Sequence, residues 1–206
     1  MEFDNYGSHL RVFEKVFATF ETKKVLEFGL GQFSTPFFVN HAEVVVSVEQ
    51  ESKEWYERIK DRIDSGNWHP IFQLDPRVVF EQFDANNQHF DLVFSDGAAE
   101  TRCLVANLAM ERNVPMVILH DTEKVWYYQW NLLSIPANYS RFNFCYRKGA
   151  NKVTTILANS NQSILEQWEI PDYDRILQAY SSPCQPVIQL RYDEVRSSID
   201  RLDRVP

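Results

Sequence analysis

The sequence predicts a doubly wound α/β fold, in which helices cover both faces of a mostly parallel sheet. Over the first three quarters of the chain, short runs rich in Val, Ile, Leu and Phe alternate with stretches of helical periodicity. The runs lack a strict alternation of polar and apolar residues, as expected for parallel strands that are buried on both faces. The strands are expected at residues 24–28, 44–48, 71–74, 91–95 and 114–119.

Helices are expected between these strands because apolar residues recur there at every third or fourth position. In the first helix, Leu10, Phe13 and Phe17 share one face. Ser52 is placed to cap a second helix, because its hydroxyl can accept a hydrogen bond from the first turn. A strand–helix–strand order repeated in this way is typical of a doubly wound sheet. The helices are expected over residues 8–21, 53–64, 101–111 and 122–133.

The pattern changes in the last third of the chain. Residues 139–146 and 152–158 are both rich in β-forming residues, and only a short stretch with Lys148-Gly149-Ala150 separates them. Such a gap is too short for a parallel crossover, so we expect an antiparallel hairpin whose second strand lies inside the sheet. Residues 1–158 then form one domain, and residues 159–206 form a C-terminal extension that packs on the domain or on a partner subunit.

Charge and composition narrow the classes of partner. The net charge of −8 disfavours a nucleic-acid partner, because an acidic surface repels a phosphate backbone. The N-terminal segment lacks the regions of a signal peptide, and the apolar runs are too short to span a bilayer. The scattered cysteines show no C-x-x-C spacing, which favours reduced thiols. We therefore expect a cytoplasmic protein without a membrane partner. The sequence leaves open whether the chain forms a homo-oligomer.

A turn with two glycines follows the first expected strand and provides a candidate binding site. Gly29 and Gly31 allow the backbone to turn tightly and to approach a ligand closely. A helix that begins near Ser34 offers free backbone N–H groups. Glu49 ends the second expected strand, about twenty residues further on. A carboxylate there accepts hydrogen bonds from both hydroxyls of a ribose, and an ordinary surface glutamate is the alternative.

Two residues favour S-adenosylmethionine over NAD as the source of this ribose. Ser34 replaces the third glycine of the dinucleotide fingerprint. Glu27 stands two residues before Gly29, where it would repel a pyrophosphate but attract the ammonium group and the sulfonium charge of S-adenosylmethionine. A nicotinamide-dependent oxidoreductase is therefore the less favoured function.

Four segments carry a resemblance to a known family: VLEFGLGQFSTPFF, VVVSVEQESKEWYERI, FDLVFSDGAAETRCL and VPMVILHDTE, in this order. Together they resemble the class I S-adenosylmethionine-dependent methyltransferases, above all bacterial members with L-E-F-G-x-G-x-S-T followed by S-V-E-x-x-x-x-W-Y. The resemblance covers about residues 8–158. It implies a Rossmann-like sheet of seven strands with the last antiparallel, in agreement with the expected hairpin.

The resemblance also implies which residues hold the cofactor. Glu27, Gly29 and Gly31 would hold its methionine part, Glu49 would hold the ribose, and Gln50 would flank the adenine.

Two aspartates follow the fourth and fifth expected strands. Asp96 and Asp121 are therefore expected at the carboxyl edge of the sheet, where ligands bind, with Asp96 also contacting the cofactor near its methyl group. Some metal-dependent O-methyltransferases have acids at both positions, so the resemblance implies Mg²⁺ as a candidate ion on Asp96 and Asp121. Those enzymes usually add Asn after the second acid or Glu before it, whereas Thr122 and His120 stand here. Helix capping by both aspartates is the alternative.

His120 is the candidate base. Methyl transfer to an oxygen requires removal of the hydroxyl proton, and histidine titrates near neutrality. Without an ion, Asp121 would be its anionic partner; a histidine that is hydrogen-bonded at a strand end is the alternative. Tyr127 and Tyr128 are candidates for the wall of an acceptor site. The remaining histidines are expected at the surface or as caps: His9, His41, His69 and His89.

The sequence thus predicts an S-adenosylmethionine-dependent methyltransferase that acts on an oxygen of a small-molecule or glycan acceptor. Asp96, His120 and Asp121 are expected to carry the chemistry. A catalytically inactive module of the same fold, which binds the cofactor or a partner, is the main alternative.

Overall fold

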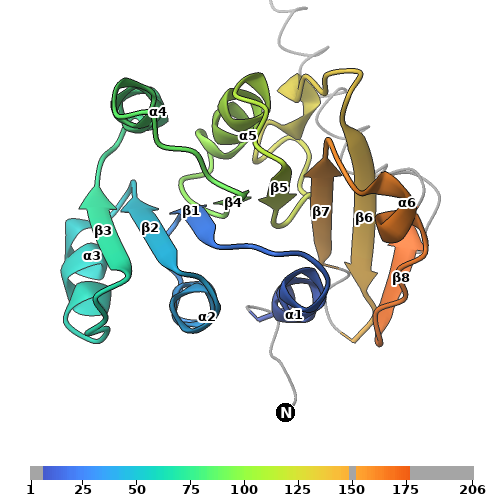
Figure 1. Cartoon of the computed structure of the whole chain (residues 1–206), viewed down its shortest axis with the longest axis horizontal. Coiled ribbons are helices and arrows are strands. Elements are labelled where there is room, and N and C mark those ends of the chain that lie inside the picture. The colour runs from blue at the N-terminus through green and yellow to red at the C-terminus, as the bar shows by residue number, and fades with distance from the viewer. Residues whose placement is uncertain (1–6, 149–151, 177–206) are drawn as a thin grey trace, which may run out of the picture.

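An eight-stranded sheet forms the centre of the computed structural model, which describes residues 7–148 and 152–176 (Figure 1). Its strands are β1 (Lys24–Phe28), β2 (Val44–Glu49), β3 (Trp68–Phe72), β4 (Leu92–Ser95), β5 (Met116–Leu119), β6 (Ser140–Tyr146), β7 (Val153–Ala158) and β8 (Tyr173–Ile176). They pair in the order β3-β2-β1-β4-β5-β7-β6-β8. Strands β1 to β5 run parallel, and every later pairing is antiparallel. The expected doubly wound sheet is confirmed.

Helices cover both faces of the sheet, as expected. Figure 1 shows one group of helices below the sheet and a second group above it. The buried hydrophobic residues accordingly form two large clusters, one on each face. The first group is α1 (Leu10–Thr19), α2 (Ser34–His41) and α3 (Lys53–Lys60), and the second is α4 (Pro76–Ala85) and α5 (Arg102–Glu111).

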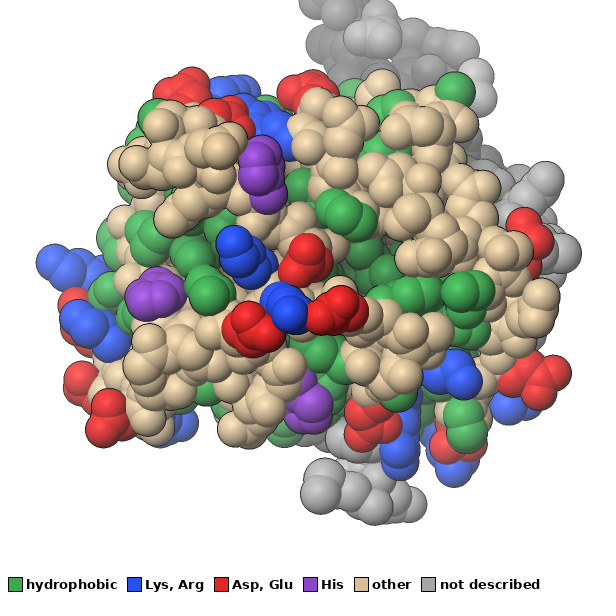
Figure 2. All heavy atoms as spheres, in the orientation of Figure 1, with side chains coloured by type: hydrophobic (Ala, Val, Ile, Leu, Met, Phe, Trp, Pro, Cys, Tyr) green, Lys and Arg blue, Asp and Glu red, His purple; other side chains and the backbone are tan. Residues whose placement is uncertain are grey.

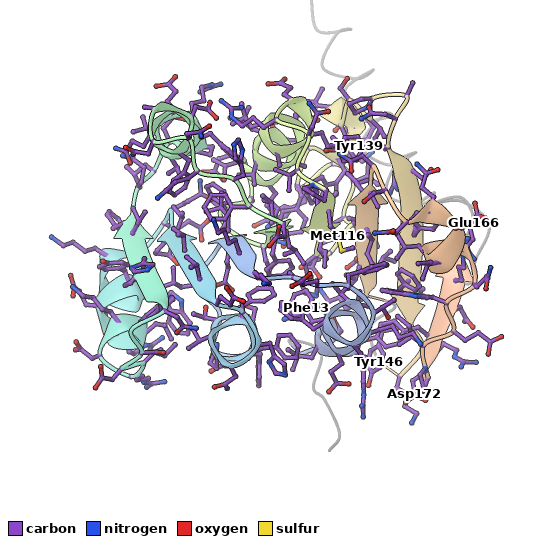
Figure 3. The ribbon with its side chains drawn as sticks, in the orientation of Figure 1. Phe13, Met116, Tyr139, Tyr146, Glu166 and Asp172 are labelled. Atoms are coloured by element: carbon purple, nitrogen blue, oxygen red, sulfur yellow. The ribbon has the colours of Figure 1, made fainter. Side chains whose placement is uncertain are left out.

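Phe13 joins the first helix to the sheet. Its fully buried ring, labelled in Figure 3, packs at centroid distances of 4.7 Å from Phe38 of α2 and 4.8 Å from Phe94 of β4. Burial of one such side chain stabilises a protein by about 1.5–3 kcal/mol. This packing holds the start of α1 close to the carboxyl end of β4.

The expected hairpin is confirmed. β6 and β7 pair antiparallel, and β7 lies inside the sheet, between β5 and β6. The expected extension adds an eighth strand to the seven that were predicted, because β8 pairs with β6. The extension also contains α6 (Gln162–Glu166), and Trp168 stacks on Phe20 at the end of α1 with a centroid distance of 5.5 Å. Residues 159–176 therefore pack on the domain, and residues 177–206 lie outside the described residues.

Two segments differ from the sequence-based expectation. Residues 122–133 form turns and a short 3-10 helix (Trp130–Leu132) instead of an α-helix. Asp121 and Gln129 have left-handed φ values of 56° and 57°, which are incompatible with a continuous right-handed helix. Conversely, α4 was not predicted; it starts with a proline in its first turn and with Asp75 as its cap.

Charges of both signs are mixed on the surface. Figure 2 shows acidic and basic side chains next to one another near the centre of the face that it presents. None of the helices within the described ranges has both the length and the apolar character needed to cross a membrane. Cys103 is a buried free thiol, as expected, but Cys145 is disulfide-bonded, so the expectation of reduced thiols is wrong for Cys145. The compartment of the protein stays a prediction.

Candidate functional site

The turn after β1 has a backbone conformation that only glycine adopts without strain. Gly29 has a φ of 95°, and its N–H donates to the Val48 carbonyl oxygen at 2.8 Å. A Cβ on Gly29 would lie 2.5 Å from the Asp96 carbonyl oxygen. The end of β1 therefore packs directly on the backbone at the end of β4. The Gly31 N–H donates to the Thr35 hydroxyl at 2.9 Å, which secures the turn to the start of α2.

Glu27 lies behind this turn and is fully buried. Its Oε2 accepts hydrogen bonds from the Ser47 hydroxyl at 2.6 Å and the Thr35 hydroxyl at 2.8 Å. Its Oε1 is buried and has no hydrogen-bond partner among the described residues. Burial raises the pKa of Glu27 to about 7, although the neighbouring hydroxyls act in the opposite direction. The site therefore contains a buried acceptor oxygen that a cationic N–H donor would satisfy.

Glu49 ends β2, the strand next to β1 in the sheet. Its Oε1 accepts backbone hydrogen bonds from Glu51 at 2.9 Å and Ser52 at 3.1 Å, at the start of α3. Its Oε2 accepts no hydrogen bond from the described residues. The adjacent Gln50 is buried, and its Oε1 accepts a hydrogen bond from the Thr101 hydroxyl at 3.0 Å. Both side chains are thus fixed in place, and one oxygen of Glu49 is available to a ligand.

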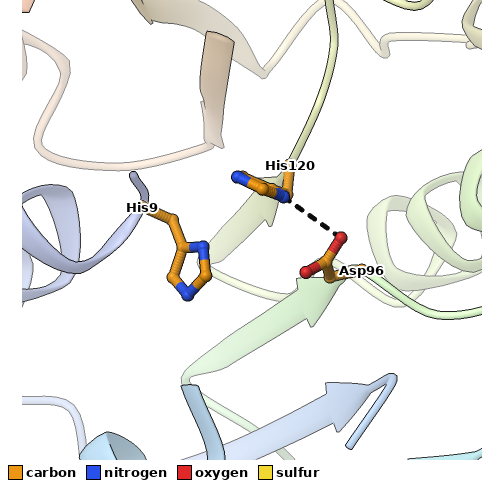
Figure 4. Close-up of side chains that lie close together, drawn as sticks. All are labelled: His9, Asp96 and His120. Atoms are coloured by element: carbon orange, nitrogen blue, oxygen red, sulfur yellow. Dashed lines mark hydrogen bonds and ion pairs between the residues drawn. The ribbon is translucent and has the colours of Figure 1, made fainter. Parts of the chain in front are cut away.

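Asp96, His120 and Asp121 lie together at the carboxyl edge, where β4 and β5 end. His120 Nδ1 is 3.2 Å from Asp96 Oδ1 and 3.7 Å from Asp121 Oδ1 (Figure 4 shows the first contact). Asp96 is therefore the nearer anionic partner of His120, whereas the sequence suggested Asp121. Burial lowers the pKa of His120, but the two carboxylates outweigh it and raise the pKa above its usual value.

Basic residues of the chain already pair with both aspartates. Arg102 Nη1 is 2.7 Å from Asp96 Oδ1 and 3.8 Å from Asp121 Oδ2. Lys152 Nζ is 2.5 Å from Asp121 Oδ1, and the Tyr128 hydroxyl donates to Asp121 Oδ2 at 3.2 Å. Burial acts to raise the pKa of each carboxyl, but His120 and these cations hold both pKa values below the usual range. The two carboxylates are neutralised by the protein, so they do not fit an Mg²⁺ ion bridging Asp96 and Asp121.

Ser8, His9 and Arg102 make contacts in the site that the sequence did not predict. His9, expected at the surface or as a cap, occupies the cap position of α1 but is buried against His120, with ring centroids 4.7 Å apart. The Ser8 hydroxyl lies 3.0 Å from His120 Nε2. Arg102 stacks over the Tyr128 ring, with its Cζ 3.8 Å from the centroid. Their only signal in the sequence is position, because they stand just before α1 and at the start of α5.

A pocket of about 430 Å³ opens beside this cluster. Its lining is polar and charged, and Tyr128 and His120 contribute its two rings. It therefore suits a small polar molecule that reaches His120 from the carboxyl edge. The lining residues are Asp96, Arg102, His120, Asp121, Lys124, Tyr128 and Lys152.

Solved structures with a similar arrangement of elements are methyltransferases. An O-methyltransferase from Bacillus cereus, in complex with S-adenosylhomocysteine, matches with a TM-score of 0.60 and 14% identity, over 77% of this chain and 82% of that chain. The O-methyltransferase TomG from Streptomyces achromogenes, involved in tomaymycin synthesis and in complex with S-adenosylmethionine, matches with a TM-score of 0.56 and 15% identity, over 75% and 79%. The chain has the class I methyltransferase fold.

The similarity to these methyltransferases lies in the three-dimensional arrangement of helices and strands. No family model matches the sequence, and the search of curated proteins gives no significant match. In a doubly wound sheet, ligands bind at the carboxyl edge of the parallel strands. The glycine turn, Glu49 and the His120 cluster of this methyltransferase fold all lie at that edge, so the fold and the local geometry indicate the same place.

Proposed function

We propose that this chain is an S-adenosylmethionine-dependent methyltransferase that transfers a methyl group to an oxygen of a small-molecule acceptor. The observation that carries the proposal is the buried Glu27 behind the Gly29 turn, with its unpartnered Oε1. A buried polar atom without a partner is unfavourable unless a ligand completes it. The ammonium group of S-adenosylmethionine supplies a positive donor, whereas the pyrophosphate of NAD would be repelled.

Two further contacts suit the same cofactor. Oε2 of Glu49 is free to accept hydrogen bonds from a ribose, and the buried Gln50 lies next to it at the edge of an adenine site. Because the backbone of Gly29 touches that of Asp96, the methionine part of the cofactor would lie beside the Asp96–His120 pair. The methyl group would then point toward the 430 Å³ pocket that these two residues line.

The protein's part in the reaction is to align the acceptor and to accept its proton. The sulfonium of S-adenosylmethionine supplies an activated methyl group, so positioning and proton removal remain. His120 is held on both ring nitrogens, by Asp96 at Nδ1 and by Ser8 at Nε2. With its Nδ1–H bonded to Asp96, His120 would take the acceptor proton at Nε2, through the Ser8 hydroxyl or in its place, and Asp96 would stabilise the imidazolium that forms. A glycan that offers one of its hydroxyls is a more specific acceptor within the same proposal.

One observation favours a second candidate. Arg102 pairs with Oδ1 of Asp96 and Lys152 pairs with Oδ1 of Asp121, so each carboxylate already has a cationic partner in the chain. This pairing suits a protein that binds the cofactor without transferring its methyl group. Turnover of labelled S-adenosylmethionine with a panel of phenols and sugars separates the two, because only the enzyme transfers the label.

Calorimetric titration tests cofactor binding first. We expect binding of S-adenosylhomocysteine and S-adenosylmethionine but not of NADH. Glu49→Ala should weaken S-adenosylhomocysteine binding at least about tenfold, because a hydrogen bond to a charged group contributes about 1.5–3 kcal/mol. Glu51→Ala is the matched control, because its exposed side chain stands two positions further along the chain. Binding of NADH alone, or equal affinities of the Glu49 and Glu51 variants, would contradict the proposal.

A further inference from the structure

We propose that His9, Asp96 and His120 form a binding site for a divalent transition-metal ion such as Zn²⁺. Each of the three side chains offers one ligand atom, and these atoms all lie within 4.8 Å of one another. Figure 4 shows the three side chains facing one another across a small space. Two imidazoles and one carboxylate suit zinc and neighbouring transition metals, whereas Mg²⁺ prefers oxygen ligands throughout. This site shares Asp96 with the Asp96–Asp121 pair, but its other two ligands are imidazoles in place of Asp121.

His9 provides the strongest evidence. His9 is only 3% exposed, and neither ring nitrogen has a hydrogen-bond partner among the described residues. Its ring packs between Phe13 and Phe94, at centroid distances of 4.9 and 5.3 Å. A buried imidazole among phenylalanines gains nothing from its polar atoms unless something binds them. An ion held jointly with His120 and Asp96 would give one of these nitrogens a partner.

His120 is prepared as a ligand by its neighbour. Its Nε2 lies 3.0 Å from the Ser8 hydroxyl, which leaves Nδ1 for a metal ion. Histidines that bind metals almost always have such a partner on the second nitrogen. Nδ1 is 3.2 Å from Asp96 Oδ1. Two ligands of a tetrahedral zinc ion are separated by about 3.3 Å, given bond lengths of about 2.0–2.2 Å. The ion would therefore take the place of the hydrogen bond between these atoms with little movement.

The fourth coordination position would face the pocket. Asp96 and His120 both line the 430 Å³ cavity, so water or an acceptor oxygen reaches the ion from that side. Three protein ligands and one open position are typical of catalytic rather than structural zinc. Arg102 Nη1 also lies 2.7 Å from Asp96 Oδ1, so the ion would share this oxygen with the guanidinium.

The metal site shares Asp96 and His120 with the proposed active site, but metal binding is measured without methyl transfer. Protein stripped with a chelator and dialysed is titrated with Zn²⁺ by calorimetry, and with Co²⁺ by its visible absorption. We expect one ion per chain, a rise in the thermal unfolding midpoint, and cobalt bands that indicate nitrogen ligands. Ser8→Ala should weaken binding about tenfold, because the partner of a liganding histidine contributes about 10–100-fold in affinity.

His9→Leu is the decisive variant. It removes one ligand, while an apolar side chain among Phe13 and Phe94 should leave the metal-free protein folded. We expect no measurable cobalt absorption in this variant, and unchanged binding in His41→Leu, which alters an exposed histidine on α2. If His9→Leu does not fold, His9→Phe replaces it with a ring of similar size. Absence of stoichiometric binding in the native chain, or equal binding by the His9 and His41 variants, would overturn the proposal.

Discussion

The buried Glu27 should make the stability of the cofactor-free protein fall as the pH rises. Burial raises the pKa of Glu27 from 4.5 to about 7. A group whose pKa is raised on folding contributes stability below its unfolded pKa, and that contribution is lost as the pH rises through the folded value. A shift of this size corresponds to about 3 kcal/mol, because each pKa unit is about 1.4 kcal/mol. The window of the effect is therefore about pH 4.5 to 8.

Glu27→Gln removes this titration and isolates the effect. Relative to the native chain, the variant should gain about 2.5 kcal/mol in free energy of unfolding between pH 5 and pH 8. Urea unfolding at several pH values measures the difference, provided that the denaturant slopes agree. Glu43→Gln is the control for the change itself, because Glu43 is an exposed carboxylate paired with Lys23. A difference between native and Glu27→Gln protein that does not change with pH would refute the reasoning.

Three further predictions concern the same region. Binding of S-adenosylhomocysteine at pH 7 should release about half a proton, because the ammonium group of the ligand would ionise the half-protonated Glu27. Calorimetric titration in buffers of different ionisation enthalpy measures this proton release. Glu27→Gln should abolish the proton release. Gly29→Ala should destabilise the protein by more than about 1 kcal/mol in urea unfolding, whereas Gly66→Ala, with nothing near its Cβ position, should have little effect. Arg102→Met should destabilise the protein by about 3–5 kcal/mol, because it removes the buried guanidinium that pairs with Asp96. The exposed Arg77→Met should cost less than about 1 kcal/mol, and equal losses would contradict the prediction.

The strands were predictable from sequence because their signal is local. Central parallel strands are buried on both faces, and β1, β2, β4 and β5 are therefore mostly apolar, with Glu27 and Ser47 as buried polar residues within β1 and β2. β3 is half-exposed, contains Pro70 and carries a weaker signal, which explains why its expected bounds were displaced. Asp96 and His120 were predictable as neighbours, since β4 and β5 lie side by side and their ends share one edge.

The rest of the site depends on contacts between distant parts of the chain. Ser8 and His120 are 112 positions apart, and no local pattern indicates that α1 brings them together. The segment after Asp121 has the apolar spacing of a helix, but Asp121 takes a left-handed conformation in which its carboxylate binds Lys152 and Tyr128. Here tertiary contacts of one charged side chain outweigh the helical periodicity of the segment.

The most direct test of the central claim is a crystal structure of the chain with S-adenosylhomocysteine. The account predicts that the ligand lies across the turn at Gly29, with its ammonium group within hydrogen-bond distance of Glu27 Oε1 or joined to it by one water. The ribose hydroxyls should contact Glu49, and the sulfur should face the pocket beside Asp96 and His120. A ligand bound elsewhere on the chain, or a glycine turn that stays empty at saturating ligand, would contradict it.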